Sequence, residues 1–341
     1  MKIIQKNFED NEIKKIAKDY IERSARSATA LQGVDGSFPP GNNGPWKDID
    51  TPVRNTAHWA YLLYTAYLFS GNSIYRLSAL KASEYLLKPE NRPDGFTFLC
   101  RTTKSKSKCN GLIGQAWAVE PLILIGKYEG RREYIETANN VLKCHEYDKK
   151  RKLFKACETD GTDLPLIRAV NQQIWLASSI IRYAVNLEAF EQSDLVPNAL
   201  NVIEELLHSA NFYRNGCFQH TLNPPFIGHA KRMIRSFRFL NFTPHYPLSV
   251  GYHSFILAGL ALAFKTLPES KIWHPWLYSK RLKTAMKFSI ELASNEQTHS
   301  PFSFQYNPTG IEIALAFIIW VWLFCDNFRY LKSQKILALQ P

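Results

Sequence analysis

The sequence predicts an all-α protein, an (α/α) toroid with short β-strands in the loops between helical hairpins. Two observations carry this prediction. A small turn followed by a short aromatic strand occurs five times, and the long stretches between these strands alternate between amphipathic and almost wholly apolar helical patterns. Paired helices that recur at such intervals are typical of repeat folds, in which neighbouring units stack to bury their apolar faces. One Phe from each strand marks the repeat: Phe38, Phe98, Phe154, Phe218 and Phe304.

Ten helices are expected, in five pairs whose first member is amphipathic and whose second is apolar. A helix apolar on all sides is an interior helix, so the second members would form an inner ring and the first members an outer ring. Five or six hairpins would then close one domain over 1–341. In order, the expected pairs are 11–31 with a helix from near Thr56, 73–87 with 114–128, 133–144 with 172–186, 196–212 with 253–264, and 276–292 with 311–324. The segment 224–247 fits no helix and is expected to be a long functional loop.

Composition favours a globular protein without a metal or redox centre. Hydrophobic residues make up 45% of the chain, and the six cysteines show no CxxC spacing, so neither a zinc site nor a redox dithiol is indicated. Reduced thiols and an N-terminus without an apolar segment predict a cytoplasmic protein. The apolar stretch 311–325 contains Glu312 and is too short to cross a bilayer, so no integral membrane segment is expected.

The charge balance indicates an anionic partner. Lys and Arg number 42 against 30 Asp and Glu, a net charge of +12, and such an excess attracts anions over long range. A solvated surface tuned for solubility explains the same excess. Nucleic acid is disfavoured, because the basic residues are scattered, the one compact run is 104–108, and no nucleic-acid-binding motif occurs. The expected partner is an acidic oligosaccharide or polysaccharide.

Polar and aromatic residues gather at the starts of the inner helices, which such a fold would bring to one mouth. A sugar site needs this pairing, because aromatic rings stack on the apolar face of a pyranose while amides and charged groups bond its hydroxyls. The candidate substrate-binding residues are Arg54, His58, Trp59, Gln115, Trp117, Arg168, Asn171, Gln172, Trp175, His245, Tyr306 and Asn307.

Two of these helix starts resemble a known superfamily. Asn110-Gly111-Leu112-Ile113-Gly114-Gln115-Ala116-Trp117 and His58-Trp59 are similar to helix starts of the six-hairpin (α/α) toroid enzymes, which include glycosidases, unsaturated glucuronyl hydrolases, uronate lyases and sugar epimerases. The resemblance covers most of the chain and implies a carbohydrate-active enzyme without a cofactor, but it fixes no subfamily. The segment 32–38 resembles the QW repeat of terpene cyclases. The acidic Asp-x-Asp-Asp signature of those enzymes is absent, so that branch ranks low.

Glycoside hydrolysis, the leading hypothesis, requires a pair of carboxylates. The candidates are Asp48, Asp160 and Glu312. Asp160 precedes Gly161, so an Asx turn is the alternative interpretation for it. Glu312 precedes an apolar run, where burial would raise its pKa, although it could also simply favour the start of its helix.

Three further reaction classes remain open. A uronate lyase would need a Tyr or His base, for which His220, Tyr252 and His253 are the candidates. Epimerisation comes third, and a glycan-binding or assembly protein without catalysis is the alternative outside enzymes. No HxxxH, HExxH or phosphate-loop motif occurs, so neither a metal nor a cofactor is expected.

Overall fold

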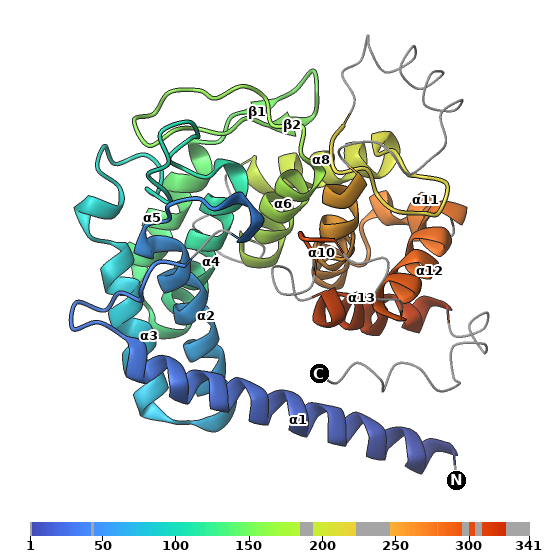
Figure 1. Cartoon of the computed structure of the whole chain (residues 1–341), viewed down its shortest axis with the longest axis horizontal. Coiled ribbons are helices and arrows are strands. Elements are labelled where there is room, and N and C mark those ends of the chain that lie inside the picture. Colours follow the sequence, from blue (N-terminus) through green and yellow to red (C-terminus); the bar gives the residue numbers. More distant parts are fainter. Residues whose placement is uncertain are drawn as a thin grey trace. The chain divides into compact units, whose positions relative to one another are not determined.

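The computed structural model describes residues 2–41, 44–184, 194–222, 246–277, 279–294, 300–303 and 309–324. Helices dominate these residues, and a two-stranded sheet accompanies them (Figure 1). The chain divides into two compact units. Unit 1 comprises Met1–Asn43, Asp48–Cys144 and Cys157–Thr162, and unit 2 comprises Gly44–Lys47, His145–Ala156 and Asp163–Pro341.

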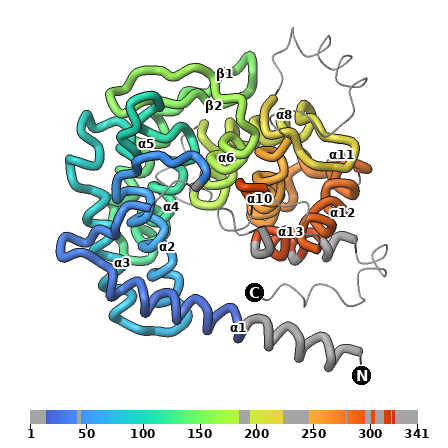
Figure 2. The backbone as a smooth tube through the Cα atoms, in the orientation of Figure 1, coloured from blue at the N-terminus to red at the C-terminus, as the bar shows by residue number. Residues whose placement is uncertain are grey.

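Unit 1 is built from five α-helices and a short 3-10 helix. They are α1 (Lys2–Leu31), α2 (Pro52–Ser70), α3 (Ser73–Leu86), η2 (Pro89–Asn91), α4 (Gly111–Glu129) and α5 (Arg132–Lys143). The apolar helices α2 and α4 pack against each other, while α1 and α3 pack against α2, and α5 packs against α4 (Figure 2). The predicted alternation of outer and inner helices is therefore present in unit 1.

Unit 2 repeats this arrangement around three inner helices. Its elements are η1 (Gly44–Trp46), β1 (Tyr147–Asp148), β2 (Leu153–Phe154), α6 (Val170–Ala184), α8 (Leu195–Ser209), α10 (Tyr246–Thr266), η3 (Lys271–Trp273), α11 (His274–Leu277), α12 (Lys280–Ser294) and α13 (Thr309–Phe324). The inner helix α10 packs against α6 and α13, while α8 packs against α6, and α12 against α13. By length and composition α10 could cross a membrane, but 83% of its apolar window is buried, as in the core helix of a soluble protein.

The predicted helices correspond to those observed, with three main differences. The helix expected at 11–31 begins at Lys2. The helix expected at 253–264 begins earlier, at Tyr246. The helix expected at 276–292 is divided between α11 and α12, because the Ser279 Oγ accepts a hydrogen bond from Leu282 N (3.1 Å) and starts α12 anew. Most of the expected loop 224–247 lies outside the described residues. The prediction of one domain over 1–341 stays a prediction.

Hydrogen bonds to side chains, instead of pairing with a neighbouring strand, hold the main chain of the aromatic strands. In each of four repeats, the main-chain N–H of the marker Phe donates to a side chain from the start of the next inner helix. We call these side chains pins. The donor and acceptor pairs are Phe38 with Thr56 (2.9 Å), Phe98 with Gln115 (2.7 Å), Phe154 with Gln173 (3.0 Å) and Phe218 with His253 (3.2 Å).

Only one of the expected strands therefore pairs in a regular sheet among the described residues. β1 and β2 form a two-stranded antiparallel sheet, whereas the segments near Phe218 and near Arg101 form isolated bridges. Buried backbone groups need a hydrogen-bonding partner, and here the pins supply it. Phe304, the fifth marker, lies outside the described residues.

Candidate functional site

In unit 2 the starts of α6 and α10 meet the segment around His220. Val170 N at the start of α6 donates to His220 O (2.8 Å), and His220 N donates to the hydroxyl of Ser249 on α10 (3.0 Å). Leu222 N donates to Arg168 O (2.9 Å). His220 is thus placed between two inner-helix starts, and Arg168 and the start of α6 lie beside it.

Aromatic rings line this junction. The His220 ring stacks on Tyr252, with centroids 5.0 Å apart and 26° between the planes. Trp46 Nε1 donates to the Tyr252 hydroxyl (3.3 Å). One turn along α10, Phe255 stacks on Trp175 of α6, with centroids 4.2 Å apart. Stacked and edge-on rings of this kind provide the apolar surfaces on which a pyranose can lie.

Glu312 is a buried acid at the start of α13. Its side chain is 8% exposed, and burial raises the pKa of its carboxyl to about 8, an effect that the Ser254 hydroxyl on α10 partly offsets. A carboxylate at a helix start is normally favoured by the dipole, but desolvation prevails here. At pH 7 the carboxyl is mostly protonated and can donate a proton. Its Oε2 has no hydrogen-bonding partner among the described residues.

Several further buried polar atoms in unit 2 have no hydrogen-bonding partner within the part of the chain that the structure describes. Three of them lie on one face of α6, at spacings of four and three residues: Asn171 Oδ1, Trp175 Nε1 and Ser178 Oγ. Native proteins leave few such groups unsatisfied, and each one requires an explanation. A ligand rich in hydroxyl groups would satisfy these atoms.

His253 has a structural role in this geometry, in place of the predicted role as a base. Its Nδ1 accepts from Phe218 N, so Nε2 carries the proton and donates toward Ala285 O (3.0 Å), beside the Ser289 hydroxyl (3.0 Å). Burial lowers the pKa of the ring to about 4. His253 is therefore neutral at pH 7, and both ring nitrogens are engaged by the protein.

The side-chain amide of Gln115 is likewise hydrogen-bonded to the backbone. Its amide donates to Phe98 O (3.0 Å) and Cys109 O (2.7 Å), and its oxygen accepts from Phe98 N. The side chain is fully buried. This geometry leaves no group of Gln115 free for the sugar-binding role that its sequence context predicted.

Asp48 and Asp50 of unit 1 are paired with cations. Asp48 is 3% exposed and accepts from Arg101 Nη1 (2.9 Å) and Lys106 Nζ (2.6 Å). Asp50 pairs with Arg54 (2.5 Å). Burial raises the pKa of Asp50 to about 6, against the opposing charge of Arg54. Asp48 is thus the centre of a buried ion-pair cluster, and Arg54 has a carboxylate partner.

His58 and Trp117 pack together in unit 1, with ring centroids 5.0 Å apart and tilted by 59°. Surrounding protein and the positive charge of Arg54 lower the pKa of His58 to about 4, although solvent reaches its ring. The imidazole is therefore neutral at pH 7. Trp59 packs on Phe38, with centroids 5.8 Å apart.

Asp160 forms the Asx turn that was the alternative interpretation of its sequence. Its Oδ1 accepts from Thr162 N (3.0 Å) and from the Thr162 hydroxyl (2.7 Å). These hydrogen bonds lower the pKa of the exposed carboxyl. Asp160 is thus ionised and engaged in a turn, which does not suit an acid catalyst.

The remaining candidates all belong to unit 2. Gln172 and Arg168 are half-buried in unit 2, while His245, Tyr306 and Asn307 lie outside the described residues. That all candidates line one cavity stays a prediction. Sequence reasoning missed Ser254 and Ser178, for which no sequence signal stood out, and Gln173, which could have been found by placing the five repeats in register.

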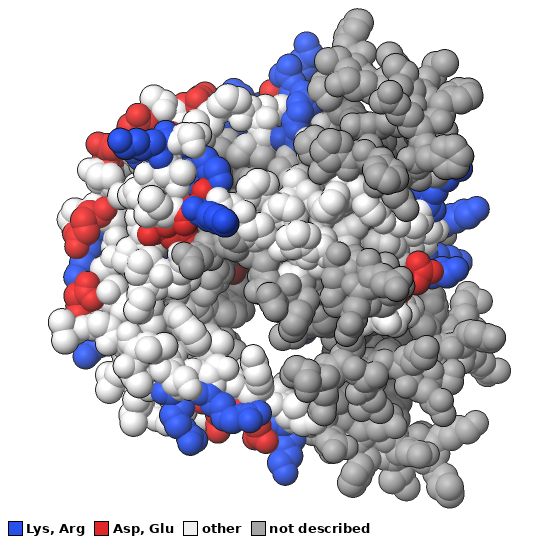
Figure 3. All heavy atoms as spheres, in the orientation of Figure 1, with Lys and Arg blue, Asp and Glu red and all other residues white. Residues whose placement is uncertain are grey.

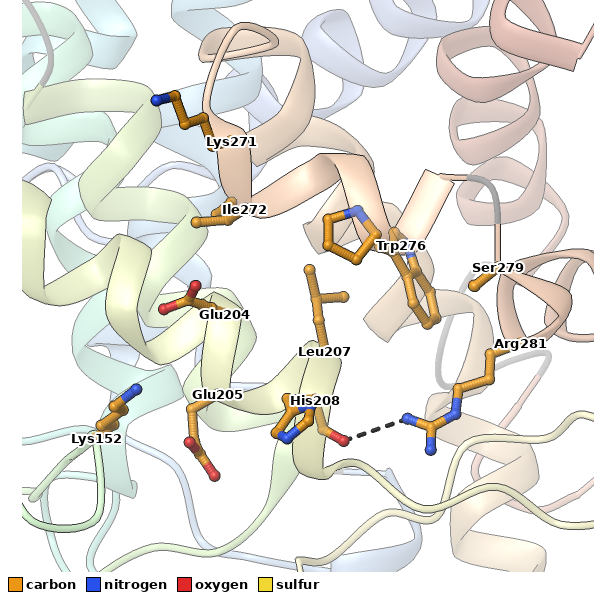
Figure 4. A pocket seen from close by; sticks show the side chains of 11 residues that line it. Lys152, Glu204, Glu205, Leu207, His208, Lys271, Ile272, Trp276, Ser279 and Arg281 are labelled. Carbon is orange, nitrogen blue, oxygen red and sulfur yellow. Dashed lines mark hydrogen bonds between the residues drawn. The ribbon is translucent and has the colours of Figure 1, made fainter.

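A pocket of about 580 Å³ in unit 2 lies apart from these residues (Figure 4). It contains none of the predicted site residues and is lined mainly by α8 and by the 271–281 segment. Its charged side chains are mixed in sign: Glu204 and Glu205 are acidic, and Lys152, Lys271 and Arg281 are basic. Arg281 donates to His208 O (3.2 Å).

Comparisons with known proteins agree with the fold. The chain resembles a D-mannose isomerase (TM-score 0.59, 14% identity, 94% of this chain and 85% of that one). It also resembles the cellobiose 2-epimerase of Bacillus thermoamylovorans (TM-score 0.51, 9% identity, 78% and 71%) and the unsaturated glucuronyl hydrolase of Bacillus sp. GL1 (TM-score 0.50, 13% identity, 71% and 63%). These enzymes are six-hairpin toroids, so the predicted (α/α) toroid class is confirmed.

No family model matches the sequence. The chain is, however, 32% identical over 321 residues to archaeal glycosylation protein Q of Haloferax volcanii, across 87% of this chain and 83% of that protein. The chain therefore belongs to the family of archaeal glycosylation protein Q.

Proposed function

We propose that this protein is a carbohydrate-active enzyme of glycan assembly, and that it cleaves a glycosidic bond with Glu312 as the proton donor. The name of its relative, a glycosylation protein, supports a role in glycan assembly. The toroid fold is one that sugar-active enzymes use, although fold alone does not determine function. The observation that carries the reaction is the buried Glu312 carboxyl, which is protonated at neutral pH.

Glycosidic cleavage requires a proton on the leaving oxygen as the bond breaks. A neutral Glu312 can donate that proton, and the aromatic rings of Trp175 and Tyr252 can position the sugar. Within α6, α10 and α13, Glu312 is the single acidic residue. These helices therefore supply no second carboxylate for the predicted pair, and we assign only the role of proton donor, to Glu312.

Elimination or epimerisation at a sugar carbon is the second candidate. It is favoured by the His220 ring stacked on Tyr252, which places an imidazole and a phenol together as a base and an acid. Both reactions would remove a proton from a carbon atom, and neither requires a water molecule to attack the sugar.

We further propose that the saccharide is acidic. Arg168 is half-buried beside His220 and makes no ion pair with any described residue, and guanidinium groups bind carboxylates in a bidentate manner. A cytoplasmic location, expected from the cysteine pattern of the sequence, remains part of this proposal.

The test is turnover of uronate-bearing oligosaccharides by the full chain in heavy-oxygen water. Hydrolysis predicts one heavy oxygen in the product and no ultraviolet absorbance from an unsaturated sugar. Glu312→Gln should abolish this turnover, whereas Glu291→Gln, on the surface of α12, should not. Ultraviolet absorbance that depends on His220 would establish elimination. Solvent deuterium on a sugar carbon would establish epimerisation, and binding without turnover would establish a glycan-binding protein.

A further inference from the structure

Two reduced cysteines lie at the base of the β1–β2 hairpin. Cys144 follows α5 as its final cap, and Cys157 follows β2. They are the last residue of unit 1 before the segment His145–Ala156 and the first residue of unit 1 after it. A bond between them would close that segment into a covalent loop.

The strand pairing brings the two ends of this segment together. The antiparallel register of β1 and β2 continues outward, where Lys155 N donates to Glu146 O (2.8 Å). Cys144 lies two residues before Glu146, in helical conformation at the end of α5, and Cys157 lies two residues after Lys155. The two thiols are also within hydrogen-bonding reach of each other.

The two thiols differ in access. Cys144 is half-exposed, whereas Cys157 is 3% exposed. Burial raises the pKa of the Cys144 thiol, and the positive charge of Arg92 partly offsets this effect. Because the thiolate is the reactive form, Cys144 should react first, slowly at neutral pH and faster as the pH rises.

We propose that Cys144 and Cys157 are a redox-active pair that forms a disulfide when the protein meets a small disulfide such as oxidised glutathione. The Cys144 thiolate attacks one sulfur of that disulfide and releases one thiol. The Cys157 thiolate then attacks the Cys144 sulfur of the mixed disulfide and releases the second thiol. In sum, two protein thiols and one small disulfide become one protein disulfide and two small thiols.

The disulfide would constrain a segment that supports the candidate site. The loop that it closes contains Phe154, which exchanges hydrogen bonds with Gln173 of α6 in both directions (3.0 and 2.8 Å). Closing a loop removes freedom from the unfolded chain and stabilises the folded one. Oxidation should therefore raise the thermal stability of the protein.

The test is peptide mapping of the full chain after incubation with oxidised glutathione and alkylation of the remaining thiols. We expect a cross-linked peptide pair that contains Cys144 and Cys157 and lacks two hydrogen masses. We also expect a rise of a few degrees in Tm that dithiothreitol reverses. Cys144→Ser and Cys157→Ser should each abolish both effects. Cys217→Ala, which removes a buried thiol of unit 2, should leave them unchanged.

A glutathione adduct that stays on Cys144, a cross-link to another cysteine, or alkylation of both thiols after oxidation would each overturn the proposal. The mapping of the wild-type protein decides the outcome even if a variant fails to fold. None of these measurements depends on enzyme activity, so the proposal and the proposed function can fail separately.

Discussion

The Glu312 carboxyl couples pH to stability as well as to chemistry. Its folded pKa of about 8 lies above its ordinary value of 4.5, so the unfolded chain loses this proton at a lower pH than the folded one. Between about pH 4.5 and 8 the unfolded state therefore binds fewer protons, and stability falls as the pH rises through this window. The buried Glu312 carboxyl thus lowers the free energy of unfolding in the same pH range in which it can donate a proton.

We expect Glu312→Gln to abolish turnover and to raise the free energy of unfolding at pH 8 by about 3 kcal/mol, because the neutral amide carries no desolvation cost of a charge. Denaturant unfolding at pH 5 and pH 8 measures the free energy of unfolding of both proteins. The stability gained by the variant should be smaller at pH 5 than at pH 8. Glu291→Gln on the exposed surface of α12 is the matched control, with no change at either pH. A variant that loses stability at pH 8 would contradict the assigned protonation state.

Asp160 provides a contrasting case, because its hydrogen bonds hold an exposed carboxylate in a turn. We expect Asp160→Ala to lower the thermal stability through loss of the Asx turn, with turnover unchanged. Asp160→Asn, which can form the same turn, should preserve both. Thermal unfolding and turnover are the measurements, and turnover that disappears in both variants would restore Asp160 as a catalytic candidate.

At the scale of the element, the helices were largely predictable and the strands were not. The phase of apolar residues is a local signal, so it located α3 and α13 within a few residues. Each of the four described aromatic strands is held by an accepting side chain on an inner helix 17 to 35 residues later along the chain. A pattern within one segment does not contain that partner. For the same reason Gln115 and His253 looked like site residues, although the backbone engages them.

The number of hydrogen bonds that each pin makes predicts how much stability its substitution costs. Gln173→Leu should cost about 3 kcal/mol, since it leaves the buried N–H and C=O of Phe154 without partners. Gln115→Leu should cost a similar amount, because it holds Phe98 in the same way. Thr56→Val should cost less, about 1 kcal/mol, since it removes one hydrogen bond. Denaturant unfolding checks the order, and a Thr56→Val loss equal to that of the glutamine variants would contradict it.

At the scale of the whole molecule, the net charge of +12 admits two interpretations, a solvated surface or attraction of an acidic glycan. Among the described residues on the face shown in Figure 3, basic and acidic side chains are interspersed, and no single basic area dominates. Diffuse charge acts over long range and is screened over about 8 Å at physiological ionic strength. A guanidinium in the site, in contrast, acts at contact distance and discriminates between acidic and neutral sugars.

The contributions of the diffuse surface charge and of a guanidinium in the site can be separated by measuring binding at different salt concentrations. If Arg168 contacts the carboxylate of a uronate, Arg168→Gln should weaken binding of the acidic sugar about tenfold and leave binding of its neutral counterpart unchanged, because a desolvated charge-assisted hydrogen bond contributes about 1.5 to 3 kcal/mol. The control is Arg281→Gln, an exposed arginine of the 580 Å³ pocket. Calorimetry at low and high salt is the measurement. Equal, salt-dependent losses in both variants would assign the attraction to the diffuse surface charge, and no loss in either would remove the acidic glycan from the proposal.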